Sequence, residues 1–425
     1  MRLTSRDRRA SLLLAATASL TLLTVLIARS AYAFSIAGSI GVGEHPEGLA
    51  FDSSNGYFYV TNYDSNTVSV IDGSTSSVVT TINVGVWPEG IAFDPANGDL
   101  YVANNEGNTV SVISGSSNMV VTTINVGSAP EGVAYDSSNG EIYVANFGTG
   151  TKAGSVSVIS TSSNDVVATV ATGAGPTQTA FDVSNGNVYV SSWDSATVDV
   201  IATSTNTIVT APITVGSEPD GLAVNPSNGD VYVTDYGSNL LEVISGSSNA
   251  AIGTVSLGTG SEPSGDAFDS ATGLIYVADS GTGTVSVIAA SNTSIIGSVT
   301  VGTGPVGIAL DTANSDVYVT NSGLGTVSII TSSSSTTSAS TASATTSSTS
   351  SSSETSTSTT PTTSSTTTSA SATSTTSSTT SSSGIPEFPS EPLAVVIATC
   401  VLAAAYLSMR GAGLRRRPAS GSHAF

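Results

Sequence analysis

A proline recurs at nearly constant spacing through most of the chain. The prolines at 46, 88, 130, 176, 219, 263 and 305 are separated by 42, 42, 46, 43, 44 and 42 residues. Each opens a unit of four short phrases, which in the first unit occupy residues 46–52, 57–62, 67–72 and 78–85. The phrases are rich in β-branched residues and are separated by Asn-Gly, Asp-Gly or Ser/Asn-rich turns, so each is predicted to be a strand. Four strands per unit are typical of a blade, so the sequence predicts an all-β, seven-bladed β-propeller.

The two ends of the repeat complement each other. Residues 34–42, which precede the first proline, match the fourth phrase of a unit, whereas the seventh unit stops after its third phrase at 326–330. We therefore expect the N-terminal strand to complete the last blade of a propeller domain at residues 34–331. A ring closed in this way leaves only short, protected strand edges, which suits a β-protein exposed to its environment.

The second and third phrases of the units carry a family resemblance. Residues 59–62 and 318–321 read Tyr-Val-Thr-Asn, and variants of this phrase stand at 101–104 and 232–235. With the Thr-Val-Ser phrases that follow, the chain resembles the YVTN family of β-propeller repeats found in archaeal surface-layer proteins. The resemblance covers all seven units and implies a surface-exposed propeller. Propellers host enzymes, binders and scaffolds alike, so it leaves the activity open.

Residues 1–33 have the layout of a secretory signal peptide. Four arginines precede an apolar run at 12–27, and Ala31-Tyr32-Ala33 forms an A-x-A site that predicts cleavage after Ala33. The pair Arg8-Arg9 is similar to a twin-arginine signal, but Ser11 stands where that pattern has an apolar residue, which favours the general secretion route. The alternative is that the apolar run remains as an uncleaved anchor.

A stalk is predicted after the propeller. Between Thr331 and Ser383, 46 of 53 residues are Ser or Thr. Such a composition has too little apolar surface to offset the entropy of ordering the chain. Residues 332–383 are therefore expected to be a disordered stalk, with dense Ser/Thr suited to O-glycosylation, and a bare flexible linker is the alternative.

The C-terminal segment predicts a membrane anchor. The apolar run at 393–409 is long enough for a transmembrane helix, and the basic tail at 410–425 would stay in the cytoplasm. The linker at 384–392 contains Pro-Glu-Phe-Pro, which resembles the PEF type of archaeal sorting signal with Pro in place of the Gly of its frequent PEFG form. We expect an extracytoplasmic cell-surface protein attached to the membrane by this helix.

Charge and rare residues exclude several functions. The formal net charge is −21, and residues 34–331 contain 27 acidic side chains against one basic side chain, Lys152. Such a domain cannot neutralise phosphates, so nucleic-acid binding is excluded. The single cysteine, Cys400, and two histidines, His45 and His423, leave no set for an internal disulfide or for a zinc or copper centre.

Functional residues are sought where the blades differ. The tyrosine repeated in every unit, Tyr59 in the first, is predicted to pack between blades, and Asp52 with Asn55-Gly56 is predicted to form a turn. In contrast, the position after each proline varies and is acidic in four units. The loop between the second and third strands opens on the same face, so the candidate ligand-binding residues are Glu47, Glu89, Glu131, Asp220, Glu218, Glu262, Tyr63, Trp87, Phe147, Trp193 and Tyr236.

This face predicts either a cation-binding rim, with Ca²⁺ as the candidate ion, or an aromatic platform for a glycan or a peptide. The alternative is that the acids only keep the surface soluble while the aromatic side chains pack within their loops. We expect a surface module for ligand binding, adhesion or envelope structure, with an extracellular ligand, glycan or protein as partner. Its rival is a metal-dependent hydrolase, similar to propeller lactonases. The sequence shows no nucleophile, base and orienting group together, which favours a role without catalysis.

Overall fold

The computed structural model describes residues 30–149 and 153–336, and all of their regular secondary structure is β-strand. No helix in this part of the chain is long and apolar enough to cross a membrane. Residues 1–29 of the predicted signal peptide lie outside the described residues. The same holds for the stalk beyond Thr336, the sorting-motif-like linker, the predicted transmembrane helix and the basic tail.

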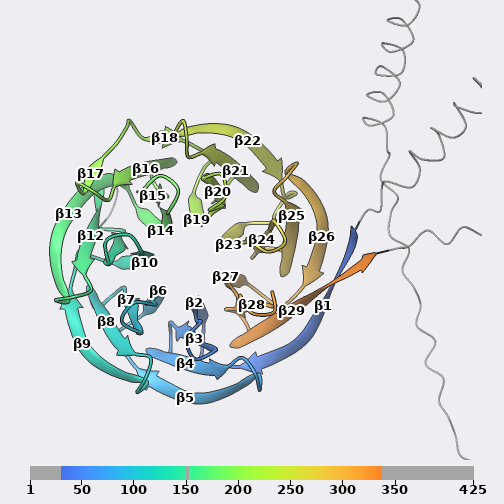
Figure 1. Cartoon of the computed structure of the whole chain (residues 1–425), viewed down its shortest axis with the longest axis horizontal. Coiled ribbons are helices and arrows are strands. Elements are labelled where there is room, and N and C mark those ends of the chain that lie inside the picture. The colour runs from blue at the N-terminus through green and yellow to red at the C-terminus, as the bar shows by residue number, and fades with distance from the viewer. Residues whose placement is uncertain (1–29, 150–152, 337–425) are drawn as a thin grey trace, which may run out of the picture. The chain divides into compact units, whose positions relative to one another are not determined.

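Seven antiparallel sheets surround a central axis, as Figure 1 shows, and the predicted seven-bladed propeller is confirmed. We number the blades 1 to 7 in the order of their inner strands. The inner strands are β2 (Pro46–Asp52), β6 (Pro88–Asp94), β10 (Pro130–Asp136), β14 (Pro176–Asp182), β19 (Pro219–Val224), β23 (Pro263–Asp269) and β27 (Pro305–Leu310). The second strands are β3 (Tyr57–Asn62), β7 (Asp99–Asn104), β11 (Glu141–Asn146), β15 (Asn187–Ser192), β20 (Asp230–Asp235), β24 (Leu274–Asp279) and β28 (Val317–Asn321).

The outer half of each blade follows the same order. The third strands are β4 (Thr67–Asp72), β8 (Thr109–Ser114), β12 (Ala153–Ser160), β16 (Thr197–Ala202), β21 (Leu240–Ser245), β25 (Thr284–Ala289) and β29 (Thr326–Thr336). The outer strands are β5 (Ser77–Asn83), β9 (Met119–Asn125), β13 (Asp165–Ala174), β17 (Thr207–Ile208) with β18 (Ile213–Thr214), β22 (Ala250–Ser256), β26 (Ser294–Thr300) and β1 (Ser30–Gly41). Blade 4 alone has a divided outer strand, because Pro212 between β17 and β18 has no N–H to donate to the sheet.

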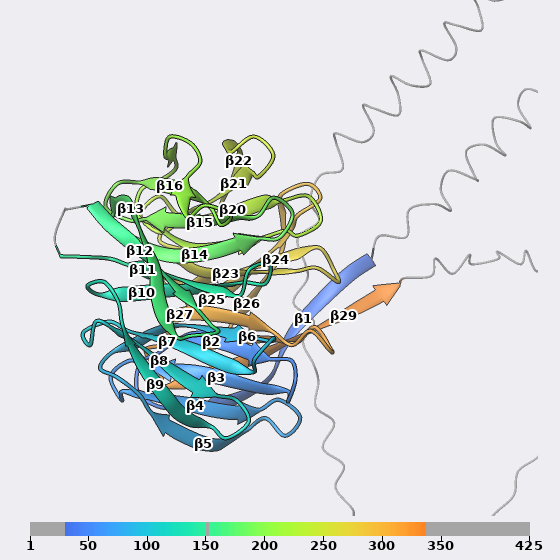
Figure 2. The ribbon, with the colours of Figure 1, turned by 60° about the vertical axis from the view of Figure 1, so that its left-hand side comes forward.

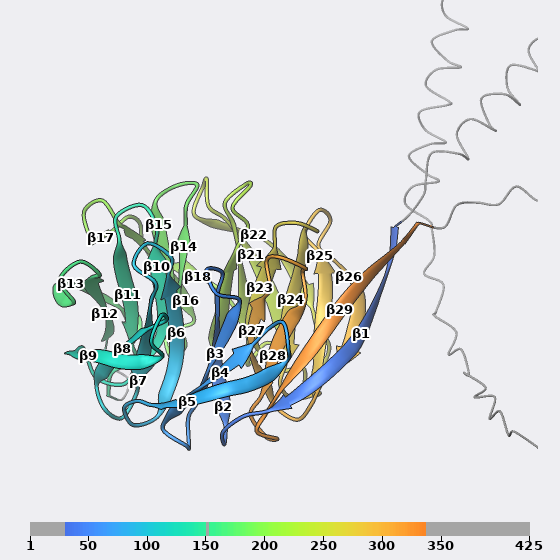
Figure 3. The same ribbon diagram turned by 60° about the horizontal axis from the view of Figure 1, so that its bottom comes forward.

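The N-terminal strand closes the ring, as the sequence predicts. β1 pairs antiparallel with β29, with Phe34 opposite Ser332 and Ile40 opposite Val327. The pairing continues beyond the expected range, from Ser30 on β1 to Thr336 on β29, and Figures 2 and 3 show the two strands running together past the rest of the blade. Tyr32 of the predicted A-x-A site stacks on Phe34 with ring centroids 6.0 Å apart, so this site contacts the propeller.

The apolar core lies between blades. One cluster joins Tyr59 and Val70 of blade 1 to Leu100 and Val102 of blade 2, and all four side chains are fully buried. The outer strands cover the core with one face only, so alternate residues such as Met119 are exposed. Each blade therefore buries its two faces against its two neighbours.

Repeated polar side chains also join the blades. The hydroxyl of Tyr59 donates a 2.7 Å hydrogen bond to Asn118 Oδ1 of the next blade, and Tyr189 donates to Asn249 at 2.8 Å. This confirms that the repeated tyrosine packs between blades. The predicted turn is confirmed too, since Asp52 Oδ1 accepts the Ser54 N–H at 2.8 Å and Gly56 has a φ of 77°.

Candidate functional site

Four acidic side chains meet at one mouth of the central channel. Glu47, Glu89, Glu131 and Asp220 stand one residue after the proline that opens each of blades 1, 2, 3 and 5, and they line one cavity of about 440 Å³. The same position in the other blades is held by Thr177, Ser264 and Val306, which also line the cavity. The structure therefore brings together the four acids that the sequence places after a proline. We call this cavity the channel mouth.

The third residue of the Tyr-Val-Thr-Asn phrase, a Thr or Ser in these blades, holds the strands that carry these acids through its hydroxyl group. Thr61 Oγ1 accepts the Gly48 N–H at 2.8 Å and donates to the carbonyl of Glu89 on the next blade at 2.6 Å. Ser191 donates in the same way to the carbonyl of Asp220 at 2.7 Å, and Thr320 donates to the carbonyl of Glu47 at 2.8 Å. The inner strands are thus held at a fixed height relative to one another, and so are the acids.

The glycine that follows these acids permits the close approach of the blades. A Cβ on Gly48 would strike the carbonyl oxygen of Glu89, and one on Gly90 would strike that of Glu131. Only glycine fits here, because the clash would be with backbone atoms that cannot rotate away. Blade 4 is the exception, with Gln178 at this position and its side chain in the channel mouth.

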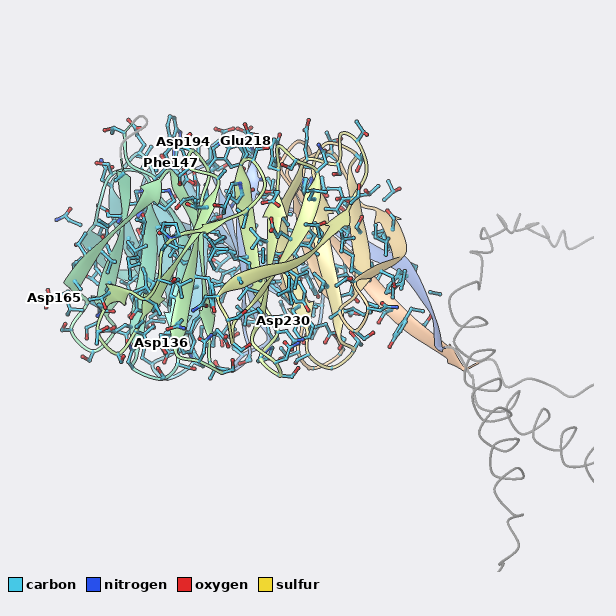
Figure 4. The ribbon with its side chains drawn as sticks, turned by 90° about the horizontal axis from the view of Figure 1, so that it is seen from above. Asp136, Phe147, Asp165, Asp194, Glu218 and Asp230 are labelled. Atoms are coloured by element: carbon cyan, nitrogen blue, oxygen red, sulfur yellow. The ribbon has the colours of Figure 1, made fainter. Side chains whose placement is uncertain are left out.

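A second set of loops opens on the same face as the mouth. Figure 4 places Phe147, Asp194 and Glu218 on one face of the propeller, and Asp136 and Asp230 on the opposite face. The residue before each proline has a positive φ, including 55° at Trp87 and 56° at Glu218, which is unusual for residues other than glycine. Its carbonyl accepts the N–H of the loop that follows the second strand, as from Tyr236 to Glu218 at 2.9 Å. In each blade, one backbone hydrogen bond therefore joins the loop that precedes the inner strand to the loop that follows the second strand.

His45 links two carboxylates at the rim, a role that the sequence analysis missed. Its Nε2 lies 3.2 Å from Glu47 Oε1, and its Nδ1 lies 3.2 Å from Asp64 Oδ2. The side chain of Glu47 is 21 % exposed. Asp220 accepts a 2.7 Å hydrogen bond from Ser264 Oγ of blade 6. Glu47 and Asp220 thus each have one polar side-chain contact, and both line the shared cavity.

Burial and mutual repulsion make the charged form of these acids costly. Burial, followed by the charges of Asp220 and Asp64, raises the pKa of Glu47 to about 8. Burial and the neighbouring carboxylates also raise the pKa of Glu89 and of Glu131 well above its usual range. Burial raises the pKa of Asp220, although the bond from Ser264 opposes the shift. The channel mouth therefore favours whatever positive charge enters it, a proton included.

Four of the aromatic candidates form two packed pairs. Tyr63 stacks on Trp87 with ring centroids 5.2 Å apart, and Trp193 packs on Tyr236 at the same separation. Tyr236 also lines the channel mouth and donates a 3.1 Å hydrogen bond to Glu262. The remaining candidate, Phe147, lies with Asp194 beside Gly175.

Three acidic residues escaped the sequence analysis because their significance depends on which strands lie side by side. Asp266 is the third residue after the proline of blade 6, a position that is Leu, Ile, Val or Thr in every other blade. Asp235 and Glu242 of blade 5 replace the Asn and Ser that bond to each other in blade 1, where Asn62 Nδ2 donates to Ser69 Oγ at 3.0 Å. Burial and the charge of Glu242 raise the pKa of Asp235 to about 8. An alignment of the seven repeats would identify these residues, because each differs from the residues at the equivalent position of most other blades.

The mouth acids are spread around the channel. Among residues 30–149 and 153–336, no three Asp, Glu, His or Cys side chains lie close enough together to hold one metal ion. The carboxylates and backbone carbonyls are suitable Ca²⁺ ligands by type, but those on blades 1, 2, 3 and 5 would have to turn toward a common point. The arrangement fits a cationic group larger than a single ion better.

Comparisons with known proteins agree with the fold. The model of the NHL repeat matches residues 217–244, which fall in blade 5. Among curated proteins, none matches the chain. A chain of hydrazine synthase from Kuenenia stuttgartiensis superposes with a TM-score of 0.62 at 18 % identity, covering 67 % of this chain and 95 % of that one. At this identity the likeness shows the fold alone. The chain is accordingly a β-propeller repeat protein with at least one NHL-like repeat.

Proposed function

We propose that this protein is a cell-surface ligand-binding module whose channel mouth binds a cationic ligand. Its attachment to the surface rests on the predicted signal peptide at 1–33 and the predicted transmembrane helix at 393–409. A propeller raised on a Ser/Thr-rich stalk would present its rim to ligands or to neighbouring surface proteins. In one form of this function, the channel mouth binds a basic segment of a neighbouring surface protein and so mediates adhesion.

The convergence of Glu47, Glu89, Glu131 and Asp220 on one cavity carries the proposal. Each has a pKa raised by burial, and the charges of Asp220 and Glu47 contribute to the shifts of Glu89 and Glu131. A bound cation relieves this repulsion and contacts several carboxylates at once. Loss of the repulsion therefore contributes to the binding free energy of the cation. The paired aromatic side chains on the rim add faces that attract cations.

The alternative of a metal-dependent hydrolase needs several side chains that converge on one metal at the mouth. No observation on the described residues favours it over ligand binding. The solubility interpretation of the acids predicts charges spread over the surface, whereas these four side chains face one cavity.

Isothermal titration calorimetry of the purified protein tests the proposal. Ca²⁺ and a short lysine-rich peptide serve as cationic probes, each at matched ionic strength, and a glutamate-rich peptide serves as the negative probe. At least one cationic probe should bind to the wild type, and the binding should be lost in Glu47→Gln with Glu89→Gln and Glu131→Gln. A matched control removes three acids away from the mouth, Asp99→Asn with Asp165→Asn and Asp230→Asn. Equal binding by both triple variants would refute the proposal.

A further inference from the structure

A second, narrower cavity continues from the channel mouth along the axis. Its volume is about 100 Å³, and it shares five glycines and Gln178 with the mouth. We call it the channel waist. Most of the side chains that line it stand at the third position after a proline, and most of these are aliphatic: Leu49, Ile91, Val133, Leu222 and Ile308. The waist therefore presents the edges of aliphatic side chains together with polar groups, beneath an acidic mouth.

Asp266 interrupts this apolar ring. Its carboxylate lies beside Gly221 of blade 5, the residue that follows Asp220. Both carboxylate oxygens are buried, and neither has a hydrogen-bond partner. The backbone N–H groups of Ala223 and of Asp266 itself favour the charged form but do not replace the lost water, so the buried carboxylate costs folding free energy. Burial and the charge of Asp220 accordingly raise the pKa of Asp266 well above its usual range.

The unpartnered carboxylate and the apolar ring together define the ligand that would fit. A donor with a positive charge would satisfy Asp266, and methylene groups would satisfy the aliphatic side chains around it. The mouth acids stand at the first position after their prolines and Asp266 at the third. At a rise of about 3.3 Å per residue, the two levels are at most about 7 Å apart, because the inner strands bulge between these positions. A ligand that uses both needs two positive groups joined by a short aliphatic chain.

We propose that the channel mouth and waist together bind a linear aliphatic diammonium ion, with one ammonium group on Asp266 and the other among the mouth acids. This inference rests on the proposed function and names its ligand class. The ligand needs two separate positive charges, because the mouth acids and Asp266 lie at two levels along the channel. A single metal ion could contact only one of these levels. The edges of the aliphatic side chains that line the waist contact the methylene groups between the charges.

Calorimetric titration of the purified full chain tests the inference, with putrescine and cadaverine as probes. n-Butylamine, which has one ammonium group, and Ca²⁺ are the comparison probes, all at matched ionic strength. Both diamines should bind at least about tenfold more tightly than n-butylamine, since a hydrogen bond between two charged groups is worth this much. If the diamines bind no better than n-butylamine, the inference is overturned.

Asp266→Leu is the decisive variant, because leucine occupies this position in blades 1 and 5. It should melt at or above the temperature of the wild type, so a loss of binding cannot be attributed to unfolding. Diamine affinity should fall about tenfold or more while Ca²⁺ affinity stays unchanged. Unchanged diamine affinity in this variant would overturn the inference. Binding of Ca²⁺ or of the lysine-rich peptide without diamine binding would overturn the inference alone, whereas no binding by any cation would overturn the proposed function as well.

Discussion

The ring of Phe34 in the closing strand lies edge-on to the ring of Tyr276 in blade 6, with centroids 6.3 Å apart and planes at 90°. The Tyr276 hydroxyl is buried without a hydrogen-bond partner, whereas Tyr59 at the same position of blade 1 donates to Asn118. Asn118 belongs to the turn between the third and outer strands of blade 2. Blade 7 has no such turn, because β29 and β1 come from opposite ends of the propeller. Aromatic packing thus replaces a hydrogen bond at the seam.

Removal of the closing strand should destabilise the whole ring. A chain that begins at Glu44 loses Phe34 and leaves β29 as an open edge, so it should aggregate or melt well below a chain that begins at Phe34. Differential scanning calorimetry of the two chains gives the comparison, and both lack the predicted signal peptide. Equal melting temperatures would show that β1 contributes nothing to closure.

The glycine after each rim acid should tolerate no side chain. Gly90→Ala places a Cβ against the carbonyl of Glu131 on the next blade, and the blades would have to separate. We expect a loss of about 1–3 kcal/mol in the free energy of unfolding, measured by urea denaturation. The control is Gly253→Ala on the outer strand β22, where a Cβ would meet nothing within 4 Å. A loss as large in the control would contradict this account of blade packing.

The residues before the prolines should gain stability from glycine. Ala129 has a φ of 49°, a conformation that costs an L-residue about 1–2 kcal/mol. Ala129→Gly removes that cost and adds a smaller entropic one, so the expected gain is about 0.5–1 kcal/mol. The same change at Ala134, a buried residue of the inner strand β10, should instead destabilise the protein. Urea denaturation of both variants checks the two signs.

The propeller was predictable because its four-strand pattern is repeated seven times. A strand that is unclear in one unit can be recognised from the equivalent strand of another. Pro46 and its equivalents mark the blades, and the turn at Asp52 follows from local chemistry. The role of Asp266 was not predictable from a single unit. Its significance comes from six neighbours at the same height, which only the register of the inner strands brings together. His45 escaped for a similar reason, since its two contacts depend on the positive φ before Pro46.

The acids of the channel mouth should make the protein less stable as the pH rises. Glu47 has a pKa of about 8 in the folded state against an ordinary value of 4.5, so the folded state holds this proton more tightly. Its contribution to stability is complete below pH 4.5 and is lost as the pH rises through about 8. Glu47→Gln should therefore melt above the wild type at about pH 9, and this advantage should shrink toward about pH 5. If the difference in melting temperature between Glu47→Gln and the wild type grew toward low pH, the raised pKa of Glu47 in the folded state would be contradicted.

The melting temperature measured with added cations shows whether the channel mouth binds them. Binding to the folded state stabilises it, so a cation that enters the channel mouth should raise the melting temperature of the wild type above that in sodium chloride of equal ionic strength. Ca²⁺ and putrescine are compared on the wild type, on Glu47→Gln with Glu89→Gln and Glu131→Gln, and on the triple variant Asp99→Asn, Asp165→Asn and Asp230→Asn. We expect a cation-specific rise in the melting temperature of the wild type and of the Asp99, Asp165 and Asp230 triple variant, and none in the Glu47, Glu89 and Glu131 triple variant. No specific rise in the wild type, or an equal rise in all three proteins, would contradict it.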